Sequence, residues 1–132
     1  MKGAASVAGA IFLARTGRNK AEIKTYVEEK YGYNLDRQLD EIRPDYRYAM
    51  SCQNSVPEAI TAFPEGDGYE DTIRNAISIG GDSDTIAAIA GSIAQGMWEI
   101  PAHMRESAAE RLDDGLKSVI KRWDLFLNEK RR

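Results

Sequence analysis

The sequence contains one cysteine and one histidine, and this scarcity excludes several kinds of chemistry. Cys52 has no second cysteine in the chain to pair with, so an intrachain disulfide is impossible. One cysteine and one histidine also cannot supply the ligands of a structural zinc site. A Ser-His-Asp triad would need His103, which follows a proline at an expected helix start, so we interpret it as a surface residue. Any chemistry would therefore depend on carboxylates and a hard metal ion.

Long apolar runs and a strong charge of one sign are also lacking. No stretch is long enough to span a membrane. The N-terminal run GAASVAGAIFLA resembles a signal peptide, but small residues dilute it and Arg15 ends it, so we interpret it as a core helix. The formal net charge of −3 gives no reason to expect a nucleic acid or an anionic membrane as a partner. We expect a cytoplasmic protein.

Alternation with a period of two is absent, whereas helical spacing recurs along the chain. Asn19 and Glu22 have the spacing of a capping box, and Gly32 is placed to end the helix that follows. The sequence around Ser55 and Pro57 resembles another helix start. The predicted helices cover residues 3–14, 20–31, 55–63, 69–79, the stretch after residue 82, a segment from about 101, and about 116–128. We predict an all-α fold, a compact multi-helix orthogonal bundle that forms a single domain over residues 1–132.

The most informative stretch is SIGGDSDTIAAIAGSIAQG, residues 78–96. Asp82 or Ser83 could cap the helix that begins here, by accepting hydrogen bonds from its first free N–H groups. Asp84 would then lie in the first turn, where the helix dipole favours negative charge. One capping residue and one acid meet those needs, yet the stretch also has a second acid and the Thr85 hydroxyl.

These additional oxygen atoms suit a hard cation. Two carboxylates spaced as Asp-x-Asp can turn toward one point, and the Thr85 hydroxyl adds a third oxygen, as Mg²⁺, Mn²⁺ or Ca²⁺ prefer. The two glycines before the acids free the backbone to approach closely. An EF-hand is excluded because the twelfth position, counted from Asp82, is Ile93. On the residues alone, metal binding and helix capping remain open alternatives.

The helix after the acids carries small residues at Ala87, Gly91 and Ala94. This spacing lets a neighbouring helix come very near. We therefore predict a central, fully buried helix that would hold the site rigidly.

The segment AISIGGDSDTIAAIAG, residues 76–91, resembles the C-terminal signature of the ADP-ribosylglycohydrolase family, the dinitrogenase-reductase-activating and ADP-ribosyl-hydrolase type. Residues 2–4, 51–59, 69–75 and 100–101 resemble that family too. The resemblance implies an all-α enzyme with two Mg²⁺ or Mn²⁺ ions at the base of a cleft. Such enzymes hydrolyse the N- or O-glycosidic bond between ADP-ribose and a protein side chain such as arginine or serine.

The resemblance also assigns roles to residues of the segment. It makes three of them metal ligands, namely Asp82, Asp84 and Thr85, and it places three others in substrate binding, namely Gly80, Gly81 and Ser83. Residues 46–55 correspond to part of the family's nucleotide-binding wall. The implied partner is ADP-ribose or an ADP-ribosylated protein.

The sequence departs from the family pattern in its N-terminal part. The Thr-Asp-Asp-Thr-like motif and the Gly-Asp-Ala-rich segment that supply the other ligands are absent, and Asp113-Asp114 looks like part of a loop between helices. The resemblance is therefore to the C-terminal half of the family domain. We expect activity to require a complementing N-terminal half, in cis or in trans.

Two alternatives to a hydrolase remain. One is a non-catalytic, truncated relative that binds ADP-ribose or a protein partner. The other is a helical interaction domain in which the acids merely cap a helix. A separated half would expose apolar faces and self-associate, and we expect the helix over residues 3–14 to be the exposed surface.

Overall fold

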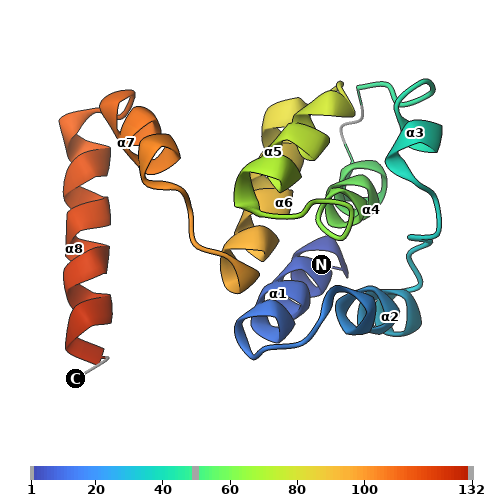
Figure 1. Cartoon of the computed structure of the whole chain (residues 1–132), viewed down its shortest axis with the longest axis horizontal. Coiled ribbons are helices and arrows are strands. Elements are labelled where there is room, and N and C mark those ends of the chain that lie inside the picture. The colour runs from blue at the N-terminus through green and yellow to red at the C-terminus, as the bar shows by residue number, and fades with distance from the viewer. Residues whose placement is uncertain (1, 49–50, 131–132) are drawn as a thin grey trace. The chain divides into compact units, whose positions relative to one another are not determined.

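The structure is a computed structural model that describes residues 2–48 and 51–130. Every regular element within these two ranges is a helix, which confirms the all-α prediction (Figure 1). Contacts divide the chain into two units, Met1–Glu99 and Ile100–Arg132. The single domain over residues 1–132 stays a prediction.

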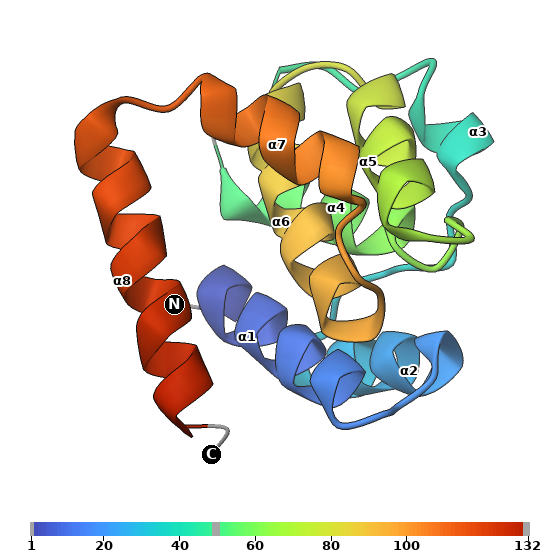
Figure 2. The same ribbon diagram turned by 60° about the vertical axis from the view of Figure 1, so that its left-hand side comes forward.

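Helix α6 is the centre of the first unit, because it packs against α1, α4 and α5 (Figure 1, Figure 2). The elements of this unit are α1 (Lys2–Arg15), α2 (Lys20–Tyr31), α3 (Leu39–Ile42), α4 (Cys52–Ala62), α5 (Tyr69–Ser78) and α6 (Ser83–Met97). The second unit contains α7 (Ala102–Glu110) and α8 (Asp114–Lys130). None of these helices is long and apolar enough to cross a membrane.

Both predicted boundaries of α2 are confirmed. The Asn19 side chain accepts a hydrogen bond from the Glu22 N–H at 2.9 Å, and the Glu22 carboxylate accepts one from the Asn19 N–H at 2.9 Å. At the other end, Gly32 has the left-handed φ of 62° that a helix-ending glycine adopts readily. These signals are local, so the sequence alone was enough to find them.

The predicted start of α4 is wrong. The helix begins at Cys52, so Pro57 lies inside it rather than in its first turn. Proline has no N–H to donate to the carbonyl four residues back, which normally weakens a helix interior. Here the turn before Pro57 is held in place because Ser55 and Val56 are buried and the Ser55 hydroxyl donates to the Ser51 carbonyl at 3.2 Å.

The prediction for α6 is correct for its position and wrong for its burial. One face is buried, but Ala88, Ser92 and Gln95 on the opposite face are exposed. The close approach of a neighbouring helix is confirmed at Gly91. A Cβ atom there would lie 2.8 Å from Cδ1 of Ile73 on α5. The absence of a side chain at Gly91 therefore sets the distance between α5 and α6.

A small apolar cluster lies beneath the junction of α5 and α6. It draws buried residues from four helices, and the half-buried Tyr46 packs against it. Its buried members are Leu39, Ile42, Ala59, Ala62, Ala76, Ile79, Ile86 and Ala90. The short helix α3, which the sequence did not predict, contributes Leu39 and Ile42 to this cluster.

Replacement of Gly91 by leucine is expected to lower the free energy of unfolding by about 1–3 kcal/mol, because the new side chain would overlap Ile73. The matched control is Ala88→Leu on the exposed face of the same helix, where we expect a change below about 0.5 kcal/mol. Urea denaturation of both variants measures the difference. Equal losses in the two variants would contradict the close packing of α5 on α6.

Candidate active site at the junction of α5 and α6

The loop between α5 and α6 turns on two consecutive glycines. Gly80 has a φ of 81° and Gly81 a φ of 60°, both in the left-handed region that other residues rarely adopt. Gly81 also lies directly against a ring, since a Cβ atom there would be 2.6 Å from Cε1 of Tyr46. Gly80 has open space on that side. Both glycines thus adopt a backbone conformation that suits glycine, and the lack of a side chain at Gly81 makes room for the Tyr46 ring.

Helix capping does not account for Asp82. This residue occupies the N-cap position of α6, yet its side chain makes no capping hydrogen bond. Its carboxyl group instead interacts with that of Asp84, whose Oδ1 atom accepts a hydrogen bond from the Thr85 N–H at 2.9 Å. The interaction with the Asp82 side chain, and after it the hydrogen bond from the Thr85 N–H, hold the pKa of Asp84 below its ordinary value.

The sequence-predicted metal ligands thus form a compact but partial donor set. The carboxyl groups of Asp82 and Asp84 are neighbours, and the side chain of Thr85 follows them in an exposed first turn. Two carboxylates and a hydroxyl suit a hard cation such as Mg²⁺ or Mn²⁺. No group of three or more acidic, histidine or cysteine side chains able to hold a metal lies within residues 2–48 and 51–130. The residues fit part of a metal site.

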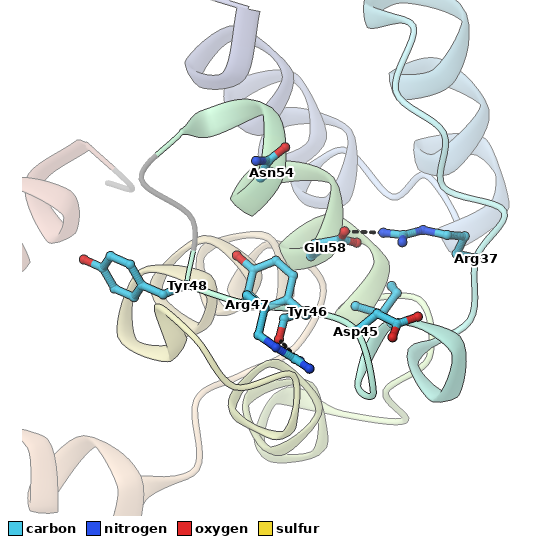
Figure 3. A pocket seen from close by; sticks show the side chains of 8 residues that line it. Arg37, Asp45, Tyr46, Arg47, Tyr48, Asn54 and Glu58 are labelled. Atoms are coloured by element: carbon cyan, nitrogen blue, oxygen red, sulfur yellow. Dashed lines mark hydrogen bonds and ion pairs between the residues drawn. The ribbon is translucent and has the colours of Figure 1, made fainter.

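A pocket of about 280 Å³ adjoins this motif through Tyr46 (Figure 3). Its lining combines two guanidinium groups, two tyrosine rings, an amide and acidic side chains. The lining residues are Arg37, Ile42, Asp45, Tyr46, Arg47, Tyr48, Asn54 and Glu58. Four of them fall within residues 46–55, the stretch expected to form a nucleotide-binding wall. Residues 49 and 50 of that stretch lie outside the described ranges.

Tyr46 connects the pocket with the acidic motif. Its ring packs on Gly81, and burial raises its pKa, with smaller contributions from the negative charges of Glu58 and Asp82. Its hydroxyl oxygen is buried without a hydrogen-bond partner among the described residues. A buried hydroxyl without a partner is costly.

Glu58 and Arg37 form an ion pair at one side of the pocket, where Figure 3 shows the two side chains pointing toward each other. The Glu58 side chain is only 10% exposed, whereas that of Arg37 is 48% exposed. Neither residue was predicted as part of a site. The available signal was the acid itself, because Glu58 interrupts the otherwise apolar or small residues from Val56 to Ala62.

Two interpretations concern the second unit. His103 is exposed on α7, as expected for a surface residue. The Asp113-Asp114 pair lies at the start of α8, where the Asp113 carboxylate accepts a hydrogen bond from the Leu116 N–H at 2.8 Å. The pair was expected in a loop between helices; Asp113 lies in that loop, whereas Asp114 is the first residue of α8.

The comparisons with known proteins agree with the motif. The family model for ADP-ribosylglycohydrolase matches residues 2–132. The chain therefore belongs to the ADP-ribosylglycohydrolase family. Neither a search of curated proteins nor a search of solved structures gives a match.

Substitution of Gly81 by alanine is expected to lower the free energy of unfolding by more than the same change at Gly80. Both substitutions place a Cβ atom at a left-handed φ, which costs about 1–2 kcal/mol. Only the Gly81 variant also pushes against the Tyr46 ring. Denaturation gives the energies, and the NMR signals of the Tyr46 ring report its displacement. An unmoved Tyr46 ring in the Gly81→Ala variant would contradict the contact.

The free energy of unfolding is expected to fall above about pH 10, because burial raises the pKa of Tyr46 and of Tyr33 in the folded state. The unfolded chain ionises these tyrosines first, so their contribution is complete below that pH and is lost as the pH rises further. Tyr46→Phe should therefore reduce the alkaline loss, measured by urea denaturation at several pH values. Tyr48→Phe removes an exposed hydroxyl from the same segment and is the control. Equal alkaline losses in both variants would contradict the burial of Tyr46.

Proposed function

We propose that this chain acts in the metal-dependent hydrolysis of the glycosidic bond that joins ADP-ribose to a protein side chain. Membership of the ADP-ribosylglycohydrolase family supports this proposal. The observation that carries it is the position of Tyr46, which packs on the glycine before the acidic motif and also lines the pocket. A ligand in that pocket would contact the same ring that packs on Gly81.

The pocket residues suit one part of ADP-ribose. Arg37 and Arg47 can donate hydrogen bonds to phosphate oxygens of a diphosphate. Asp45 and Glu58 balance the charge of these two arginines in the pocket. The exposed Tyr48 ring offers an aromatic face. A volume of about 280 Å³ is at the lower end for ligand pockets, so the pocket would hold one end of the molecule.

Asp82, Asp84 and Thr85 are the residues that would hold Mg²⁺ or Mn²⁺. When bound, such ions orient ribose hydroxyls and lower the pKa of a water molecule. The chain's own part is to keep the two carboxyl groups together at the N-terminus of α6, on a loop fixed by Tyr46. The full two-metal set needs further ligands, and the family resemblance assigns these to an N-terminal motif. We therefore propose that catalysis requires a complementing N-terminal half, in cis or in trans.

ADP-ribose binding without catalysis is the second candidate. Two carboxylates and one hydroxyl are fewer ligands than a divalent cation takes. The pocket, in contrast, is formed by residues of this chain alone. Binding that does not depend on a metal ion would favour this candidate.

Calorimetric titration of the chain with ADP-ribose, with and without Mg²⁺, tests the proposal. We expect binding that strengthens with Mg²⁺ and a loss of that gain in the double variant Asp82→Ala, Asp84→Ala. The control is Asp114→Ala, Asp124→Ala, which removes the same charge from the second unit and should bind as the parent does.

Three results would count against the proposal. Absence of binding in the parent would contradict a pocket for ADP-ribose. Equal binding with and without Mg²⁺ would support the non-catalytic candidate. Loss of binding in the control double variant would show that overall charge, rather than the motif, is responsible.

A further inference from the structure

Exposed apolar side chains gather on α8. Six large apolar residues of this helix are between 45% and 58% exposed, namely Leu116, Val119, Ile120, Trp123, Leu125 and Phe126. No residue of the helix is buried. Monomeric soluble proteins rarely leave so much contiguous apolar surface open, and a patch of this kind commonly marks an interaction site.

Most of these residues form one stripe along the helix, here called the α8 stripe. It consists of Leu116, Val119, Ile120, Trp123, Phe126 and Leu127, which recur at intervals of three and four residues. This spacing is that of a heptad pattern, in which such a stripe meets a partner helix. The rings of Trp123 and Phe126 stack with centroids 5.5 Å apart at the middle of the stripe.

Helix α7 lies beside one edge of the α8 stripe and leaves the rest of it uncovered. A groove of about 280 Å³ lies where α7 and α8 meet, and Ala109 and Leu112 form its α7 side. Its α8 side is formed by Lys117, Ile120, Lys121, Asp124, Leu125 and Asn128, so Ile120 is the one residue of the stripe that lines this groove. Ile120 is still 46% exposed. Within the second unit, most of the stripe is therefore open to a partner.

Charged residues at the edge of the α8 stripe identify the partner. Arg122 and Glu129 flank the stripe on the same side, seven residues apart. In an antiparallel pair of identical helices, equivalent flanks face each other. Arg122 of one copy then faces Glu129 of the other, and symmetry repeats the pair. A helix with one cation and one anion on the same flank is thus complementary to its own reversed copy.

We propose that the α8 stripe binds the α8 stripe of a second copy of this chain, in an antiparallel arrangement. The register that pairs Arg122 with Glu129 also places Trp123 beside Phe126 of the second copy. On the other flank it places Ile120 beside Leu127 of the second copy. One register thus satisfies the ionic, aromatic and aliphatic contacts at once.

A parallel pair would not achieve this match. In parallel helices, opposite flanks meet, so Arg122 would face the apolar flank that carries Ile120 and Leu127. An uncharged apolar groove on another protein would likewise leave Arg122 and Glu129 without partners.

The α8 stripe differs from the surface that the sequence suggested for self-association. Helix α1 buries Gly3, Ser6, Ala10 and Ala14 against other parts of the first unit. Its exposed large apolar side chain is Phe12. Among the described residues, most of the exposed apolar surface is therefore on α8 rather than on α1.

Sedimentation velocity of the full chain at increasing concentration tests this proposal. We expect a dimer that dissociates on dilution. Arg122→Glu and Glu129→Arg each turn two ion pairs into two like-charge contacts, so each should raise the dimer dissociation constant about tenfold. The double variant Arg122→Glu, Glu129→Arg restores opposite charges and should return the constant to within about threefold of the parent's.

The matched control is Lys117→Glu, Asp124→Lys, which exchanges charges on the side of α8 that lines the groove with α7, away from Arg122 and Glu129, and should leave the dimer unchanged. Circular dichroism verifies that each variant keeps its helix content. A parent that stays monomeric at all concentrations would overturn the proposal. Three other results would overturn it as well. The single variants could dimerise as tightly as the parent, or the double variant could fail to regain the parent's dissociation constant. The control could also dimerise as weakly as the single variants.

Discussion

The packing of the Tyr46 ring on the backbone of Gly81 is the contact on which the site depends. The ring occupies the space that a side chain at position 81 would fill. It thereby joins two segments that are 35 residues apart in sequence, the stretch after α3 and the turn into α6. The acidic motif and the pocket thus share this one ring. The lack of a side chain at Gly81 makes the contact possible, and its left-handed φ suits glycine as well.

Helix α6 connects this contact with the rest of the first unit. Its buried face contacts three other helices, and at Gly91 the Ile73 side chain of α5 lies directly against the α6 backbone. The acids at its N-terminus lie where the helix dipole favours negative charge. A rigid helix with a favourable electrostatic end can hold two carboxyl groups side by side, although neither is buried and like charges repel.

Local patterns made much of the fold predictable. The capping box at Asn19 and the helix end at Gly32 need only neighbouring residues, so sequence spacing identified them. The contiguous 82–85 motif was found for the same reason. The start of α4 was not, because burial of Ser55 and Val56, in the turn before Pro57, outweighs the preference of Pro57 for a helix start. The ion pair of Arg37 with Glu58 joins residues 21 positions apart, and no local pattern encodes such a contact.

Cys52 gives the molecule a useful chemical property. It is the one thiol in the sequence, it is exposed, and it lies in the first turn of α4, two residues before the pocket residue Asn54. A fluorophore or spin label attached by thiol chemistry would therefore modify a single known position without any engineered residue. Because the Cys52 side chain lies against Gly3 of α1, the label would report on the contact between α1 and α4 in solution.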